Sequence, residues 1–383
     1  MSLKRPMSIV FIAIAAALLT VGVYAALMLW SATRPVFAQS APDTLDGLVA
    51  DWAALPDIPG AILFVQQGEE VIYAGASGTL RKDGGAALTT ETPFHTASVG
   101  KLFTAVTVLR LHERGALDID APAAHYLGAS VIADLLVVDG IDYGEQITIR
   151  QLLSHRAGLG NTDKYLPFNL SILTRPNRVW TPQDLIEQAR RVPPAGRPGE
   201  QTQYSSPGYF LLGLVIEAVT GQPYHQAVRR EVFAPLGMDA TFESTHEWRG
   251  EFETLHHYAG WIDLTDHNPS FEFADGGFVT TAQDLARFGI VMAQGALFEN
   301  PQTMQLLLLP PDGADPTRQY RALGPRVDFT ETGTRLIFHN GSWGVRFIVS
   351  PDADAVAVIA LGQTGARTKM FWDAARALLI GLF

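Results

Sequence analysis

Residues 95–103 read HTASVGKLF and place Ser98 three residues before Lys101, inside an otherwise apolar run. The chain contains five lysines, and only Lys101 has a serine three positions earlier. We predict that a helix begins at Ser98, because the apolar residues that follow would cover nearly its whole circumference and bury it on most sides. Residues three apart lie on one helix face, so the two side chains should be in contact.

Ser98 and Lys101 could together form an activated nucleophile. A serine hydroxyl reacts poorly until a neighbouring base takes its proton. Burial destabilises the ammonium form of a lysine, so we expect a lowered pKa for Lys101, which would let it act as this base. The alternative is structural: Ser98 would cap the helix and Lys101 would extend to the surface. The pair alone does not decide between these interpretations, since a chain of this length contains about one such pair by chance.

Two further stretches carry polar groups that could face the same cleft. Residues 204–206, YSS, lie in a loop bounded by glycine and proline, directly before an apolar helix. Tyr204 could relay a proton there, or it could pack as an aromatic with a solvated tip. Residues 339–341, HNG, end a predicted strand, where Gly341 would let another segment approach the backbone and the Ser342 N–H could face the cleft. The alternative for HNG is a hairpin turn, for which Asn-Gly is a strong signal.

The order of elements predicts an α/β (α+β) fold. Residues 61–78 contain two strand-like runs around a turn at 68–69, and the C-terminal part returns to strands rich in β-branched residues. The region from about 116 to 295 is mostly helical, and an amphipathic helix ends the chain. One antiparallel sheet built from both chain ends, flanked by helices and joined to a large helical subdomain, is the simplest arrangement. The expected helix caps are Thr148, Thr181, Gly115, Gly221 and Gly295.

The N-terminal region predicts export. Residues 7–30 are uncharged, and 24 helical residues span about 36 Å, enough to cross a bilayer. We therefore expect a cytoplasmic tip (1–6) with Lys4 and Arg5, a transmembrane signal anchor (7–30), a linker (31–45) and one globular domain (46–383) on the periplasmic or extracytoplasmic side. The alternative is a signal peptide cleaved near Ser40, which would release a secreted protein.

Composition excludes several function classes. The formal net charge of −11 argues against nucleic-acid binding, and the absence of cysteine excludes disulfides and thiol chemistry. One loop region is rich in histidine and aspartate, but its spacing matches no recognised metal motif, and we expect no metal there. Its residues are His246, His256, His257, Asp263, Asp266 and His267. The oligomeric state stays open.

Taken in order, the motifs S-x-x-K, Y-x-S and H-x-G resemble those of the serine penicillin-recognising hydrolases. The most similar branch holds class C β-lactamases, D-alanyl-D-alanine carboxypeptidases, D-aminopeptidases and β-lactamase-like carboxylesterases. Four flanking stretches agree with it: LLSHRAGL (152–159), YSSPGYFLLGLVIEAVTGQPY (204–224), PLGM (235–238) and ADGGFVTTAQDLARF (274–288). The resemblance covers roughly residues 46–383.

The resemblance implies a β-lactamase-like fold and a role for each motif. Ser98 is similar to the family nucleophile, which forms an acyl-enzyme, and Lys101 is similar to its activating partner. Tyr204 resembles the proton relay that also protonates the leaving group. The N–H groups of Ser98 and Ser342 would form the oxyanion hole, and His339 would line the far wall of the cleft. Neither a metal nor an organic cofactor is implied.

Two departures from the family pattern bear on the substrate. Ser206 stands where relatives usually carry asparagine, and Asn340 stands where they carry a threonine whose hydroxyl can hold a carboxylate. Histidine is also mostly neutral at neutral pH, unlike the usual lysine at position 339. We therefore expect an esterase or a peptidase-like amidase acting on small ester, amide or peptide substrates of the acyl or D-amino-acid type. The alternatives are a true β-lactamase or D-Ala-D-Ala carboxypeptidase, and a non-hydrolytic membrane-tethered sensor or scaffold.

Two residues near these motifs stay outside the predicted machinery. His155, within LLSHRAGL, resembles a triad base but takes a structural role from the family match. Asp275 opens a turn that leads into a helix and could line the cleft.

Overall fold

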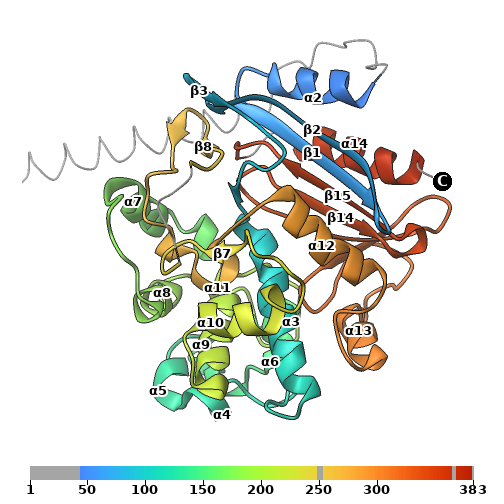
Figure 1. The fold of residues 1–383 in the computed structure, drawn as a ribbon. Coiled ribbons are helices and arrows are strands. Elements are labelled where there is room, and N and C mark those ends of the chain that lie inside the picture. Colours follow the sequence, from blue (N-terminus) through green and yellow to red (C-terminus); the bar gives the residue numbers. More distant parts are fainter. Residues whose placement is uncertain (1–43, 248–252, 365–367, 382–383) are drawn as a thin grey trace, which may run out of the picture.

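The structure is a computed structural model that describes residues 44–247, 253–364 and 368–381. Its largest element is an eight-stranded antiparallel sheet that joins both ends of the chain (Figure 1). Strand β1 pairs with β2 on one side and with β15 on the other. In sheet order the strands are β11 (Tyr320–Arg321), β12 (Arg326–Phe329), β13 (Arg335–Asn340), β14 (Arg346–Ser350), β15 (Ala355–Ala360), β1 (Gly60–Gln67), β2 (Glu70–Arg81) and β3 (Gly84–Ala87). The expected sheet from both chain ends is confirmed.

The central strands are buried on both faces because helices cover the sheet on each side (Figure 1). Alternate residues of a strand point to opposite faces. In β1, Leu63 packs in one core with α2 (Leu45–Ala53) and α14 (Thr368–Gly381). Its neighbour Ile62 packs in the other core with α12 (Ala282–Ala293) and the helical region. This two-sided burial explains why β1 and β15 are apolar at nearly every position.

The helical region surrounds one central helix, α3 (Lys101–Glu113), whose residues are buried on most sides as predicted. It begins at Lys101 rather than at Ser98, because Ser98 lies in a preceding 3₁₀ turn, η1 (Ala97–Gly100). The other α-helices are α4 (Ala124–Leu127), α5 (Ala129–Ile132), α6 (Ile149–Leu153), α7 (Leu166–Thr174), α8 (Pro182–Ala189), α9 (Ser206–Thr220), α10 (Tyr224–Val228), α11 (Phe273–Gly276) and α13 (Pro301–Leu307).

Short elements connect these helices. The 3₁₀ turns are η2 (Gly144–Gln146), η3 (Thr162–Lys164), η5 (Pro269–Phe271) and η6 (Pro351–Ala353), and η4 (Arg229–Phe233) is a π-helical turn. The small sheets are β4 (Phe94–His95), β10 (Phe278–Thr280) and β7 (Phe242–Glu243); β5 (Val137–Val138) and β6 (Ile141–Asp142); and β8 (Tyr258–Ala259) and β9 (Ile262–Asp263).

The predicted caps are confirmed. Thr148 and Thr181 accept hydrogen bonds from the third backbone N–H of α6 and α8, and both form capping boxes. Gly115, Gly221 and Gly295 follow helices with φ of +70°, +64° and +71°, a conformation in which a side chain would be strained. In the segment 116–295 helices are the main regular structure, but they make up fewer than half of its residues, so the expectation of a mostly helical segment is only partly met. Its last helix, α12, packs on the sheet.

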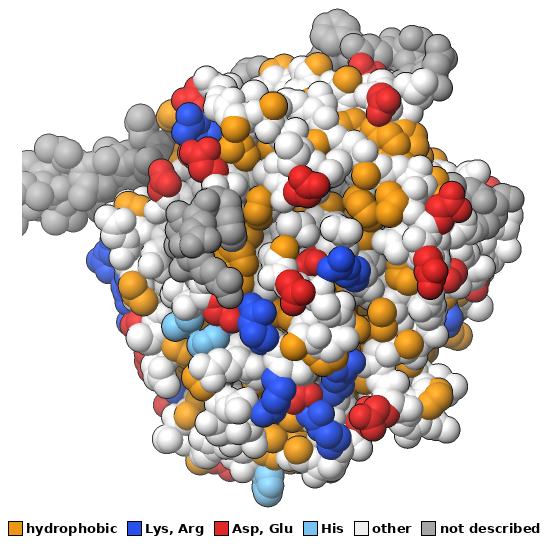
Figure 2. Space-filling view, in the orientation of Figure 1, with side chains coloured by type: hydrophobic (Ala, Val, Ile, Leu, Met, Phe, Trp, Pro, Cys, Tyr) orange, Lys and Arg blue, Asp and Glu red, His pale blue; other side chains and the backbone are white. Residues whose placement is uncertain are grey.

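The surface mixes charges of both signs: basic and acidic side chains lie beside one another on the face seen in Figure 2. Ion pairs account for part of this mixture, for example Arg229 with Glu247 at 2.7 Å. Within the described ranges, no helix has both the length and the apolar character needed to span a membrane. The expected anchor at 7–30 lies outside the described residues, as do the tip and most of the linker.

Candidate active site

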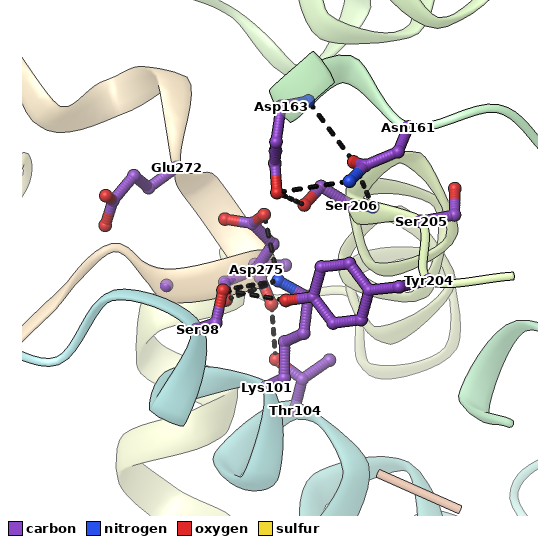
Figure 3. A network of polar contacts seen from close by, with 12 residues as sticks. Ser98, Lys101, Thr104, Asn161, Asp163, Tyr204, Ser205, Ser206, Glu272 and Asp275 are labelled. Atoms are coloured by element: carbon purple, nitrogen blue, oxygen red, sulfur yellow. Dashed lines mark hydrogen bonds and ion pairs between the residues drawn. The ribbon is translucent and has the colours of Figure 1, made fainter. Parts of the chain in front are cut away.

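Two segments far apart in the sequence meet at the Ser98 hydroxyl (Figure 3). Ser98 lies in η1, Lys101 is the first residue of α3, and Tyr204 lies in the loop before α9. The Tyr204 hydroxyl donates a hydrogen bond to Ser98 Oγ at 2.7 Å, and Lys101 Nζ donates to the same oxygen at 3.3 Å. The structure thus brings together the three residues that the sequence singled out.

The backbone around Ser98 is tightly constrained. Ala97, the preceding residue, has φ of +44°, a left-handed conformation that an alanine rarely adopts. Two glycines make room for this turn. A Cβ on Gly276 would lie 2.6 Å from the Ala97 carbonyl carbon, and one on Gly341 would lie 2.4 Å from the Thr96 oxygen. The predicted close approach of another segment at Gly341 is therefore confirmed.

The environment of Lys101 differs from the prediction. The side chain is fully buried, and this burial alone would lower its pKa. The Asp275 carboxylate, at 3.0 Å from Nζ, outweighs that effect together with Tyr204 and Asp163, so the pKa of Lys101 is raised above its ordinary value. The expected lowered pKa is wrong, because the sequence does not show that Asp275, 174 residues away, faces this amine.

Tyr204 is held by stacking and by its hydrogen bond to Ser98. The His155 ring lies 4.5 Å from the Tyr204 ring, and its Nδ1 accepts a hydrogen bond from the Ser205 N–H. Burial, with smaller effects from nearby cations, places the pKa of His155 well below its usual range, so this ring is neutral. His155 therefore positions Tyr204 and does not act as a base, in line with the structural role expected for it. Burial also raises the pKa of Tyr204, although the Lys101 ammonium opposes this.

Ser206 faces an acidic partner that the sequence motifs did not indicate. Its Oγ donates to Asp163 Oδ2 at 3.1 Å, and its N–H donates to Asn161 Oδ1 at 3.3 Å (Figure 3). Burial of the carboxyl group and the neighbouring Asp275 carboxylate raise the pKa of Asp163. The only local sequence signal for this arrangement is Asn161, whose side chain caps the turn η3.

The third motif divides into a buried and an exposed part. His339 is buried, its ring lies 6.5 Å from the Tyr204 ring, and burial places its pKa well below the usual range, so it is neutral. Its Nδ1 lies 3.1 Å from the Asn340 carbonyl oxygen. Ser342, in the turn after β13, is exposed and lines the same cavity as Ser98. Among the described residues, the lining of this cavity does not include His339 or Asn340, and the role of His339 at the far wall of the cleft stays a prediction.

A cavity of about 200 Å³ opens beside Ser98. Most of its wall is apolar, and its polar groups are hydroxyls, amides and carboxylates. The residues that line it are Ser98, Asp163, Phe168, Asn169, Ile172, Leu173, Phe210, Ala259, Leu264, Phe271, Glu272, Asp275, Ser342, Trp343 and Thr364. Such a pocket suits a small substrate with an apolar part.

The histidine- and aspartate-rich loops do not converge on one point. His256 Nδ1 lies 2.7 Å from Asp263 Oδ2, and the His257 ring stacks on Trp343 at 4.3 Å. Elsewhere among the described residues, ligand atoms of His225, Glu243 and His246 lie within 4.8 Å of one another. The Glu243 carboxylate there accepts hydrogen bonds from two backbone N–H groups and lies 2.8 Å from the His246 ring nitrogen Nδ1.

Comparison with known proteins places this site in a family. The family described as Beta-lactamase matches residues 46–380. Curated relatives include penicillin-binding protein 4 of Amycolatopsis lactamdurans, 32% identical over 181 residues, and esterase EstB of Burkholderia gladioli, 34% identical over 202 residues. These matches cover 47% and 50% of this chain but only 44% and 48% of the relatives.

A solved structure supports the same fold over a longer stretch. The D-stereospecific amidohydrolase from a Streptomyces species is 25% identical, with a TM-score of 0.73 that covers 85% of this chain and 96% of that one. The resemblance inferred from the three motifs is thereby confirmed. The chain belongs to the Beta-lactamase family.

Proposed function

We propose that this protein is a serine hydrolase that cleaves small esters or amides, including D-amino-acid-type substrates, through an acyl-enzyme on Ser98. The observation that carries the proposal is the Ser98 hydroxyl, held at 2.7 Å by Tyr204 and at 3.3 Å by Lys101 beside an open cavity. The family relatives named as an esterase and as a D-stereospecific amidohydrolase support this choice of substrate class.

The Ser98 proton has a defined route in this proposal. Lys101 is an ammonium in the resting site because its pKa is raised. Transfer of one of its protons to the Asp275 carboxylate, 3.0 Å away, leaves a neutral amine beside a neutral acid. The amine then accepts the Ser98 proton as Oγ attacks the substrate carbonyl. The Tyr204 hydroxyl donates a proton to the leaving group and regains one from Lys101, which in turn recovers its own from Asp275. The backbone N–H groups of Ser98 and Ser342 stabilise the oxyanion.

Two departures from the family motifs favour ester or amide hydrolysis over β-lactamase or D-Ala-D-Ala carboxypeptidase activity. Ser206 is occupied by its hydrogen bond to Asp163, so it does not replace an asparagine amide that would hold an acylamino group. His339 is neutral and buried, so it does not attract a substrate carboxylate. Each lost polar contact in the transition state costs about 1–3 kcal/mol.

The proposal also places the catalytic domain outside the cytoplasm on a membrane anchor. It is supported by the uncharged segment 7–30, which is long enough to cross a bilayer, and by Lys4 and Arg5 before it. The alternative is release as a secreted enzyme after cleavage near Ser40.

The first test is covalent labelling. A fluorophosphonate should add one adduct to Ser98, located by mass spectrometry, and Ser98→Ala should abolish both labelling and turnover. Side-by-side kinetics should give a much higher kcat/KM for a short-chain nitrophenyl ester than for a chromogenic cephalosporin. Labelling on another residue would refute the nucleophile, and a preference for the cephalosporin would identify a β-lactamase. An adduct with no turnover of any substrate would favour the membrane-tethered sensor.

A further inference from the structure

The cavity beside Ser98 combines an apolar wall with three carboxyl groups. Phe168 and Phe210 belong to its apolar wall, whereas Asp163, Glu272 and Asp275 supply the carboxyls. A cavity of this kind selects its ligand by charge as well as by shape, because electrostatic interactions are strong where little water is present. A carboxyl group without a cationic partner in the protein is free to bind a cationic group of a ligand.

Only Asp275 among these three is part of an ion pair within the described residues, at 3.0 Å from Lys101 Nζ. Asp163 lines the cavity, and its side chain accepts hydrogen bonds from two neutral donors, Ser206 Oγ at 3.1 Å and Asn161 Nδ2 at 3.5 Å. No lysine, arginine or histidine of the described segments forms an ion pair with it. Asp163 therefore has no cation in direct contact among the described residues, although the more distant Lys101 ammonium opposes the rise in its pKa.

Glu272 gives an independent indication of a ligand. Its side chain is only 7% exposed, and its Oε1 accepts a hydrogen bond from Trp343 Nε1 at 2.8 Å. Its other oxygen, Oε2, is buried with no hydrogen-bond partner among the described residues. A buried polar atom without a partner costs free energy, so such an atom at a cavity wall indicates a group that is bound there during function.

We propose that this cavity binds the protonated amine of the substrate, with Asp163 and Glu272 as its carboxyl partners and the apolar wall holding an adjacent side chain. The substrate class is then an ester or amide whose acyl part carries a free amine and an apolar group. This inference rests on the proposed function, because it places the amine near the carbonyl that Ser98 attacks.

Charge explains why an amine fits and a carboxylate does not. An ammonium donates up to three hydrogen bonds, and its bonds to carboxyl groups are charge-assisted. A substrate carboxylate, as in penicillins or peptides that end in D-Ala, would meet Asp163 and be repelled. N-acylation of the substrate amine would remove the positive charge and with it the attraction.

The test compares two esters that differ only in the amine: phenylalanine methyl ester, as each enantiomer, and 3-phenylpropionate methyl ester. The ammonium itself activates the neighbouring ester. The informative quantity is therefore how a mutation changes the ratio of kcat/KM for the amine-bearing ester to kcat/KM for the ester without the amine. Asp163→Asn should lower this ratio about ten-fold or more, as expected for one lost charge-assisted contact. Effects on Ser98 or Lys101 that are common to both esters cancel in the ratio.

The matched control is Glu69→Gln, which removes an exposed carboxylate in the β1–β2 turn, away from the cavity, and should leave the ratio unchanged. If Asp163→Asn fails to fold, as judged by thermal unfolding, Glu272→Gln serves instead, because it keeps an acceptor for Trp343 and removes the acid. If the ratio in the folded variant stays within two-fold of the ratio in the unmodified protein, the proposal is overturned. Hydrolysis of both esters in that case would leave the proposed function intact.

A binding measurement separates this inference from the proposed function. Calorimetry on the Ser98→Ala variant should show phenylalanine amide binding at least about ten-fold more tightly than 3-phenylpropionamide, and adding Asp163→Asn should remove that difference. This result needs no turnover, so it stands even if Ser98 is never acylated. Equal affinity for the two amides would reject the amine site.

Discussion

At the scale of single residues, the site depends on a buried ion pair beside the nucleophile. Lys101 is fully buried and Asp275 holds its ammonium at 3.0 Å. Removal of one partner of such a pair leaves an uncompensated charge in the interior, which is strongly destabilising. The pair therefore holds Lys101 Nζ 3.3 Å from Ser98 Oγ, and in the proposed mechanism its proton moves before Ser98 reacts.

Replacement of the lysine tests this role. Lys101→Arg should reduce kcat/KM about as severely as Lys101→Ala, roughly 10²–10⁴-fold, because a guanidinium does not release its proton and does not fit the space of a fully buried lysine. Nitrophenyl-ester kinetics on the purified variants would measure it. Lys82→Arg, at a half-buried lysine outside the cavity, is the control. Retention of most activity by Lys101→Arg would show that the lysine acts only through its charge.

At the scale of elements, short local signals set where helices begin, and the start of α8 is the clearest case. Thr181 accepts from the Asp184 N–H at 3.1 Å, and the Asp184 carboxylate accepts from the Thr181 N–H at 2.9 Å. That backbone hydrogen bond, with the Thr181 hydroxyl and Arg178, outweighs burial and lowers the pKa of Asp184. A capping residue of this kind contributes about 1 kcal/mol to stability.

The pH dependence of this cap has a defined sign. Because the pKa of Asp184 is lower in the folded state, its carboxylate stabilises the fold above the unfolded value of about 3.9, and the contribution is lost as pH falls through the folded pKa. Asp184→Asn should therefore be less stable than the unmodified protein at pH 7, and the difference should be smaller at an acidic pH below the unfolded value of about 3.9. Urea unfolding at both pH values would measure it.

The control for the cap is Asp312→Asn, which changes an exposed carboxylate in the loop after α13. A stability difference for Asp184→Asn that persists unchanged in acid would mean that the asparagine alters packing rather than the charged cap.

At the scale of the whole molecule, the active site exists only where the helical region meets the sheet. Ser98, Lys101 and Tyr204 come from the helical side, whereas Ser342 follows a strand of the sheet. The sheet is closed by pairing β1 with β15, strands that begin 295 residues apart, as Gly60 and Ala355 show. Correct assembly of the two chain ends is therefore a condition for catalysis.

The segment before the domain leads to a prediction about where the molecule lies in the cell. We expect the full chain to remain in the membrane fraction after a high-salt wash, with its N-terminus intact, because 24 uncharged residues hold it by hydrophobic insertion rather than by charge. Fractionation and N-terminal mass spectrometry would check this. A new terminus at Ala41 would establish cleavage and a secreted protein instead.

The local features of this protein follow from its sequence alone. The caps at Thr148 and Thr181 and the glycines that end helices are encoded within a few residues, because capping hydrogen bonds and positive φ angles are local. The contact between Ser98 and Lys101 follows from their spacing, since a 3₁₀ turn leading into a helix still brings residues three apart together. The ordered motifs also identified the family and hence Tyr204.

The electrostatic character of the site was decided only by the tertiary structure. Asp275 raises the pKa of Lys101, although burial alone would lower it. Burial places the pKa of His339 well below its usual range, and Asp163 accepts the hydrogen bond of the Ser206 hydroxyl. These effects depend on distances of about 3 Å between groups far apart in the chain, and Coulomb energies at such distances depend on burial as well as on separation. Spacing along a sequence specifies neither quantity, so the residues of the nucleophile were predictable and the charges around it were not.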